Sequence, residues 1–154
     1  MSAADPTIPE LEQLESIEFE SIDNDIAVRL GEVAVATIRD LNLNLAVDIV
    51  IDDDLVFRAK LGSTGPGNDP WLAKKAATAR HFGTTSLLAR LRSEAGDGTL
   101  PPTSTEQAES MALYGGSFPI RVRGDLRGTI TMSGETDTVD HTAVVETIRR
   151  FLSP

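Results

Sequence analysis

Two stretches of alternating apolar residues constrain the fold of this chain more than any other feature of its sequence. The first runs over residues 45–51 and returns over 55–61, and the second runs over 118–122 and returns over 126–132. An apolar residue at every second position is typical of a half-buried strand. Turn-forming residues between the paired runs make each stretch a hairpin. Because helical patterns separate the hairpins, we predict an α+β fold: a mainly antiparallel sheet with helices packed on it.

Apolar residues recur at helical spacing in the segments before, between and after the hairpins, which predicts helices there. Asp23 is the expected N-cap of a helix through Leu41, and Asp69 is the expected N-cap of a helix from Trp71 to Phe82. Shorter or later helices are expected after Thr84 or Thr85, over 106–113, and after Asp137 or Thr138. Together with the hairpins, these helices complete the predicted α+β pattern.

The chain has the length of one ordinary domain, since it contains 154 residues. We expect residues 1–16 to form a tail and a short helix, capped by Thr7. We expect residues 17–154 to form a single domain, with Ile17–Ile22 as a short extended edge segment.

Composition and charge exclude several classes of function. A net charge of −10 weighs against binding to nucleic acids and to anionic membrane surfaces. The chain has no cysteine, which excludes disulfides, thiolate metal sites and cysteine nucleophiles. No apolar run reaches the length of a membrane span, and no secretory signal is visible at the N-terminus. We therefore expect a cytoplasmic protein.

Sequence motifs for catalysis are weak, so no catalytic residue is assigned. The chain has neither a Gly-x-Ser-x-Gly elbow nor a phosphate loop ending in Lys-Ser or Lys-Thr. The loop over 62–69 is either a plain connection or a ligand-lining segment, and the acids at 52–54 fit an exposed turn better than a calcium loop. A basic middle region either is solvated or attracts an anionic ligand or an acidic neighbouring subunit; it comprises Lys74, Lys75, Arg80, Arg90 and Arg92.

Glycines flank the second hairpin and mark a candidate ligand site. Gly115 and Gly116 precede its first strand, and Ser133 and Gly134 follow its second. Glycines at strand ends permit either a tight turn or the close approach of another backbone segment or of a flat ligand. Trp71, beside the glycine-rich loop, either covers a pocket or packs in the core or an interface.

Two histidines offer imidazole nitrogens. His81 lies at the end of the helix from Trp71, where a structural or solvated role is expected. His141 lies in the first turn of the last helix, in register with the apolar positions Val144 and Ile148. The positive end of that helix disfavours the imidazolium form, so a neutral ring there could ligate a metal or haem iron. The alternative is a satisfied, partly buried histidine.

In combination, these motifs resemble the haem-degrading-domain family, the GlcG/HbpS-like group, and in particular its small cytosolic branch. The resemblance spans roughly residues 17–152. It rests on Asp23-Asn24-Asp25, Asn68-Asp69-Pro70-Trp71 with Lys74-Lys75, Gly115-Gly116-Ser117-Phe118-Pro119-Ile120, Gly128 to Gly134, and Asp140-His141.

The resemblance implies a profilin-like or PAS-like α-β-α sandwich that assembles into homo-oligomers. It also implies haem or tetrapyrrole binding, and slow haem breakdown in some relatives. A non-enzymatic adaptor or scaffold is the alternative that the same family implies. The implied ligand-binding residues are Gly115, Gly116, Phe118, Ser133, Gly134, Lys75 and Trp71, with His141 as the haem-iron ligand. Arg121, Arg123, Lys74 or Lys75 would pair with the haem propionates.

Overall fold

A computed structural model describes residues 5–96 and 103–153 of the chain. Its centre is a four-stranded sheet in which all neighbouring strands are antiparallel and the strand order is β2-β1-β4-β3. The strands are β1 (Ala46–Ile51), β2 (Asp54–Lys60), β3 (Ser117–Val122) and β4 (Asp125–Ser133). Both predicted hairpins are present, and β1 and β4 join them at the middle of the sheet.

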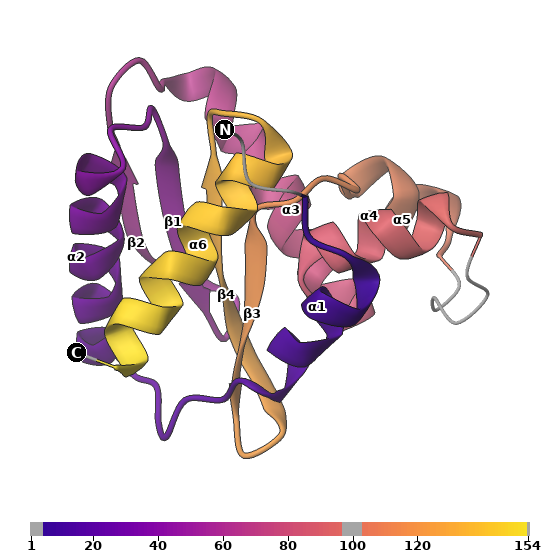
Figure 1. The fold of residues 1–154 in the computed structure, drawn as a ribbon, viewed down its shortest axis with the longest axis horizontal. Helices are drawn as coiled ribbons and strands as arrows, with labels where there is room; N and C mark the ends of the chain where they lie inside the picture. The colour runs from indigo at the N-terminus through magenta and orange to yellow at the C-terminus, as the bar shows by residue number, and fades with distance from the viewer. Residues whose placement is uncertain (1–4, 97–102, 154) are drawn as a thin grey trace.

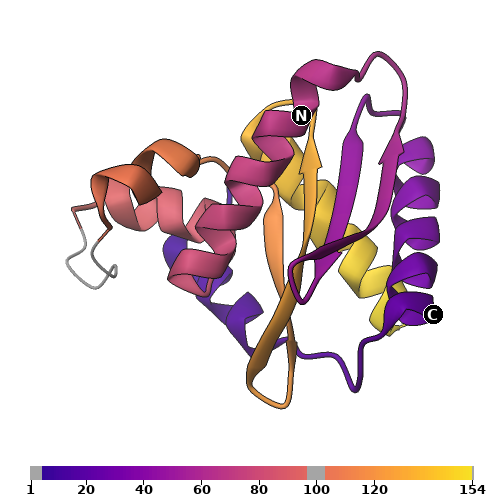
Figure 2. The same ribbon diagram turned by 180° about the vertical axis from the view of Figure 1, so that it is seen from behind.

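Helices cover both faces of this sheet, which confirms the predicted α+β class (Figure 1). α2 (Asn24–Asp40) and α6 (Asp137–Leu152) lie on one face. On the other face, α3 (Asp69–Phe82) packs mainly over β4 and β3 and leaves most of β2 uncovered (Figure 2). The remaining helical elements are α1 (Ile8–Gln13), a 3-10 helix (Leu14–Ser16), a 3-10 helix (Pro66–Asn68), α4 (Ser86–Glu94) and α5 (Thr105–Ser110).

The main apolar core lies between the sheet and the pair α2 and α6. Leu30, Ile49, Ile130 and Ile148 are at most 1% exposed there. Burying each such side chain stabilises the fold by about 2 kcal/mol. α2 approaches β2 closely because Gly31 has no side chain: a Cβ at this position would lie 2.5 Å from the Phe57 ring.

The opposite face of the sheet is polar where α3 covers it. Ser117, Thr129, Thr131 and Ser133 are at most 5% exposed, and they alternate along their strands with the core residues. The hydroxyls of Ser117 and Thr131 lie 2.9 Å apart and hydrogen-bond to each other. This buried polar surface leads along the strands to the end of β4, where the candidate site lies.

Both hairpins contain a bulge. In β2, Val56 is the extra residue, because Ile49 pairs with Phe57 while Val50 pairs with Leu55. In β4, the extra residue is Arg127. A bulge bends its strand and increases the local twist.

The N-terminal helix α1 packs against α4. The hydroxyl of Thr7 caps α1, as predicted, and Leu11 is 1% exposed between α1 and α4. Residues 17–22 form no edge strand; a single parallel bridge joins Phe19 to Val122. The reason is that Phe19 and Ile22 turn inward and become part of the main core.

The predicted helix caps are partly right. Asp23 caps α2 as expected, but the cap residue of α3 is Asn68 rather than Asp69. Asp69 lies in the first turn of α3 and pairs with Lys60 at 2.7 Å. The cap of α6 is Thr136, which precedes both expected positions, Asp137 and Thr138; its hydroxyl accepts from the backbone N–H of Val139.

Candidate functional site

An open cleft of about 450 Å³ lies where α3 begins, β4 ends and α6 begins. The segment that precedes β3 closes one side of it. The lining residues are Asn68, Trp71, Lys75, Tyr114, Ser133, Gly134, Glu135, Thr136, Asp137 and Asp140. Its volume is within the usual range for small-molecule sites, roughly 300–1,000 Å³.

Two aromatic rings stand at the cleft. Trp71, in the first turn of α3, and Tyr114 meet edge to face, with ring centroids 5.7 Å apart and an interplanar angle of 78°. Their residues are 45% and 47% exposed. Large aromatic groups that remain so exposed in a concave site are available to stack on a ligand.

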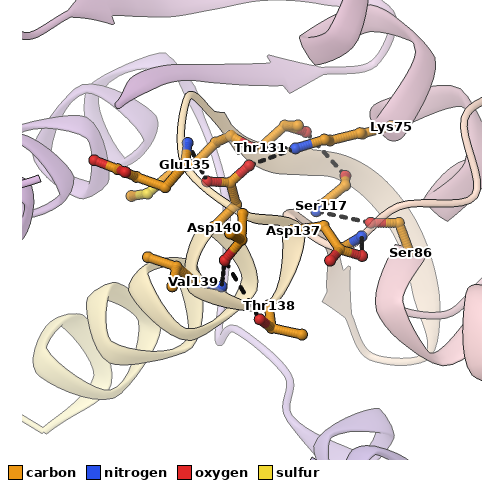
Figure 3. A network of polar contacts seen from close by, with 12 residues as sticks. Lys75, Ser86, Ser117, Thr131, Glu135, Asp137, Thr138, Val139 and Asp140 are labelled. Carbon is orange, nitrogen blue, oxygen red and sulfur yellow. Dashed lines mark hydrogen bonds and ion pairs between the residues drawn. The ribbon is translucent and has the colours of Figure 1, made fainter. Parts of the chain in front are cut away.

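A buried ion pair forms the floor of the cleft (Figure 3). The Nζ of Lys75 lies 2.7 Å from Oδ2 of Asp140 and also donates to the backbone carbonyl of Met132 at 3.1 Å. The two side chains are only 5% and 2% exposed. The second oxygen of Asp140 accepts from the backbone N–H of Glu135 at 3.0 Å. Burial raises the pKa of Asp140, and the neighbouring ammonium of Lys75 opposes this rise.

The glycines around the cleft make room for the protein's own atoms. A Cβ on Gly116, whose φ is +131°, would lie 2.5 Å from the Met132 carbonyl oxygen and 3.0 Å from the Nζ of Lys75. A Cβ on Gly134, whose φ is +154°, would lie 2.1 Å from the Asn44 carbonyl oxygen. A Cβ on Gly115 would lie 2.6 Å from the Asp137 carbonyl oxygen. These glycines therefore allow close packing of β3, β4 and α6.

The structure brings some of the expected site residues together and separates others. Trp71, Lys75, Ser133 and Gly134 all line the cleft. Gly116 lies behind them, against Lys75. Phe118 is 1% exposed and packs in the main core, on the other face of the sheet from Lys75.

His141 also lies apart from the cleft, although it follows Asp140 directly. Its side chain lines a second recess of about 190 Å³, bounded by residues of the N-terminal segment and of α6. His141 is 4% exposed, and desolvation lowers its pKa from 6.5 to about 4. The imidazole is therefore neutral at pH 7, as expected from the sequence, but it cannot reach a ligand in the cleft without rearrangement.

The basic middle of the sequence does not form one free cationic patch. Lys75 is paired with Asp140, Arg90 with Asp137 at 2.7 Å, and Arg92 with Glu12 at 2.9 Å. In the same way, Arg121 is paired with Glu15 at 2.7 Å and donates to the Gly83 carbonyl. Within residues 5–96 and 103–153, no group of histidine and acidic side chains is arranged to hold a metal ion.

Sequence reasoning missed Tyr114 and the acidic half of the cleft. Tyr114 precedes the two glycines, and Glu135 and Asp137 stand at the start of α6. The dipole of a helix favours acidic residues in its first turn, so Asp137 and Asp140 read as ordinary helix-start residues. Nothing in the sequence indicates that Asp140 meets Lys75, which lies 65 positions earlier.

A family model described as "Haem degrading protein HbpS-like" matches residues 22–149 of the chain. The chain therefore belongs to the HbpS-like haem-degrading family. A UPF0303 protein of Streptomyces coelicolor is 35% identical over 149 residues, which cover 96% of this chain and 94% of that protein. A UPF0303 protein of Schizosaccharomyces pombe is 27% identical, over 93% of this chain and 82% of that protein.

Solved structures share the same fold at low sequence identity. The Ybr137w protein superposes with a TM-score of 0.79 and 22% identity, over 97% of this chain and 90% of that one. The PduOC:heme complex gives a TM-score of 0.66 and 20% identity, over 83% and 93% of the two chains. In the described residues, no helix has the length and apolar character needed to span a membrane.

Proposed function

We propose that this chain binds haem or a related flat tetrapyrrole in the cleft beside α6. The observation that carries the proposal is the exposed pair Trp71 and Tyr114 at a recess of small-molecule size. Membership of the HbpS-like family supports the choice of ligand, as does the shared fold with a protein solved as a haem complex.

The cleft residues fit such a ligand in two respects. Trp71 offers an aromatic face for a planar macrocycle, and Tyr114 offers a phenolic oxygen, a known type of haem-iron ligand. When bound, haem would supply an iron centre for electron-transfer or oxygen chemistry. Glu135 and Asp137 would repel propionates, so we infer that these groups point outward. Lys74 is exposed and lies one helical turn after Trp71 on α3, so its ammonium group could pair with the propionates of a haem stacked on Trp71.

Haemin titration tests the proposal and identifies the ligand position. We expect a saturable Soret band in the wild-type protein, and about tenfold weaker binding in Trp71→Ala from the lost stacking and apolar contact. Tyr114→Phe should shift the band, whereas His141→Ala should not. Leu41→Ala, an exposed apolar position outside the cleft lining, is the matched control for Trp71→Ala. No saturable band in the wild type would refute the proposal.

The competing assignment of His141 as iron ligand gives the opposite result. In that case His141→Ala would move the Soret band and Tyr114→Phe would not. Slow haem breakdown is a further prediction, checked by loss of the Soret band over hours in the presence of a reductant and air. A Soret band that stays constant under these conditions would contradict the predicted haem breakdown but would be compatible with haem binding.

We also infer that the chain self-associates, which would suit the alternative function of a homo-oligomeric adaptor. Leu55 of β2 and Leu126 of β4 are 45% and 39% exposed, and both lie near Val50 of β1: Leu55 is its strand partner, and Leu126 lines the same recess. Exposed apolar residues grouped on one face favour an interface. Light scattering at micromolar concentration should give a dimer or larger assembly, and Leu126→Glu should reduce its mass. A wild-type monomer would contradict this inference.

A further inference from the structure

The N-terminal helical segment covers a groove between α4 and α6. This covering segment, residues 7–16, presents Ile8, Leu11 and Leu14 at three-residue spacing, which places them on one face. Leu11 is 1% exposed and packs against Leu87 and Leu88 of α4. Leu11, Leu87 and Leu88 form an apolar cluster that is separate from the main core. The groove therefore has an apolar base that the main core does not supply.

Charged contacts fix the direction of the covering segment. Glu12 pairs with Arg92 of α4 at 2.9 Å, and Glu15 pairs with Arg121 of β3 at 2.7 Å. Glu15 also accepts from the backbone N–H of Thr85 at 3.3 Å. The groove thus combines an apolar base with two arginines along its side. An acidic amphipathic helix is complementary to such a surface.

The contact between the covering segment and α6 is incomplete. A recess of about 190 Å³ remains between Leu11 and Leu14 on one side and His141 and Val145 on the other. His141 is 96% buried and borders this recess. Nε of Arg92 and Nη1 of Arg121 are buried, and neither atom has a hydrogen-bond partner among the described residues. A buried polar atom without a hydrogen bond is uncommon in a native structure. The covering segment therefore leaves polar atoms of the groove unsatisfied.

The covering segment can also open separately from the main core. α1 spans only Ile8–Gln13, and a helix this short has little stability without its packing partner. Local opening of such a segment can occur without unfolding the main core.

We propose that α4 and the start of α6 form a docking groove for an acidic amphipathic helix of a partner protein, which residues 7–16 occupy in the free chain. The partner helix would carry apolar residues at the spacing of Ile8, Leu11 and Leu14 and carboxylates facing Arg92 and Arg121. A further carboxylate or carbonyl oxygen that accepts from Nε of Arg92 or Nη1 of Arg121 would give it an advantage over the covering segment. This proposal goes beyond haem binding and does not depend on it.

A full-chain variant with an opened groove tests the proposal. Leu11→Asp removes the central apolar anchor of the covering segment without touching the main core. The probe is a fluorescent peptide of residues 5–18 of this chain, followed by anisotropy. We expect saturable binding to Leu11→Asp and at least tenfold weaker binding to the wild type, whose groove is occupied. The same peptide carrying Leu11→Asp is the matched control and should not bind.

The side chain of His141 reports on the groove directly. In the wild type its ring has a pKa of about 4 because it is desolvated. In Leu11→Asp, NMR titration should move this pKa upward, and saturating peptide should lower it again. Arg92→Glu in the opened variant should weaken peptide binding about threefold, the size expected for one partly exposed ion pair.

Two results would overturn the proposal. One is a folded Leu11→Asp protein that does not bind the peptide. The other is peptide binding that leaves the His141 resonance unchanged, which would place the peptide elsewhere. If Leu11→Asp does not fold, Glu12→Arg with Glu15→Arg provides the second opened variant, since it reverses both anchoring charges and keeps every apolar contact. Absence of peptide binding to that folded variant would equally refute the groove.

Discussion

The first turn of α6 lies between the cleft and the groove, and it contributes one buried titratable side chain to each. The surroundings of these two side chains, Asp140 and His141, differ. On the cleft side, Asp140 is charge-paired with Lys75 and hydrogen-bonded to the backbone of Glu135. On the groove side, the side chain of the adjacent His141 is also buried, but it borders a recess beside Leu11 and Leu14 instead of joining an ion pair. The cleft is therefore held in one arrangement by a buried polar network, whereas the groove is closed by apolar packing and by the ion pairs of Glu12 and Glu15 with Arg92 and Arg121. This difference suggests a rigid ligand site beside an exchangeable surface.

Breaking the ion pair of the cleft should have the largest effect. Lys75→Met leaves the Asp140 carboxylate buried without a counter-charge, which typically costs about 3–5 kcal/mol. We expect urea unfolding to show a loss of this size. The double variant Lys75→Met with Asp140→Leu removes both charges and should recover most of the stability. Equal losses in the single and double variants would show that the pair contributes by shape rather than by charge.

Acid should weaken the groove side through His141. Because burial lowers its pKa from 6.5 to about 4, the native state favours the neutral ring. The neutral ring of His141 contributes to the free energy of unfolding in full above pH 6.5. This contribution is lost as the pH falls toward 4, because His141 is then protonated in the unfolded chain but still neutral in the native protein. The total is about 3 kcal/mol. Urea midpoints at pH 7 and pH 4.5 would measure most of it.

His141→Gln is the control for that pH dependence. It keeps a polar side chain of similar size but does not titrate, so its stability should fall less between pH 7 and pH 4.5 than that of the wild type. Asp137 and Arg149 act on the same ring with opposite signs and remain in both proteins. Parallel pH profiles for the two proteins would show that His141 is solvated and that the groove is already open.

Gly134→Ala should strain the cleft side by a smaller amount. The new Cβ would meet the Asn44 carbonyl oxygen at 2.1 Å, and its φ of +154° is unfavourable for alanine. We expect a loss of about 2 kcal/mol, measured by thermal or urea unfolding. Gly67→Ala is the matched control, because nothing lies within 4 Å of a Cβ there and its φ is not in the left-handed region. A neutral Gly134→Ala would mean that the end of β4 moves freely.

Removing one charged contact of the covering segment should have the smallest effect. Glu12 is 50% exposed in its side chain, so its ion pair with Arg92 is well screened. Glu12→Gln should reduce stability by less than about 0.5 kcal/mol in urea unfolding. The same change in 0.5 M salt should have almost no effect. A loss above 1 kcal/mol would mean that charge, rather than Leu11, holds the segment down.

Local patterns in the sequence were sufficient for the strands and most helices. The alternation over 45–51 and 118–122 gave both hairpins, and the capping roles of Asp23 and Thr85 follow from side chains that bond within three residues. Asp69 was assigned wrongly because its carboxylate is engaged by Lys60 of β2, a contact made only after the chain folds. The prediction of an extended edge segment over residues 17–22 was wrong for a related reason, since Phe19 and Ile22 pack in the main core.

The candidate site was less accessible to sequence reasoning. Trp71, Lys75 and Gly134 were identified, but the side of α6 on which His141 falls depends on how that helix rotates against the sheet. Adjacent helical residues diverge by about 100°, so Asp140 and His141 enter different recesses. The glycines were correctly marked as sites of close approach. The approaching atoms are the protein's own carbonyl oxygens, which no local pattern reveals.

The bulge at Val56 has a consequence for the behaviour of the protein at high concentration. β2 is an outer strand, so one row of its backbone groups faces away from β1. A straight, apolar outer strand would act as a template on which further chains stack into fibrils. Here the extra residue kinks the strand, and the charged side chains of Arg58 and Lys60 follow the kink, so an incoming strand meets a broken hydrogen-bonding register. We therefore expect that concentrated solutions of the protein form no fibrils through the β2 edge during storage.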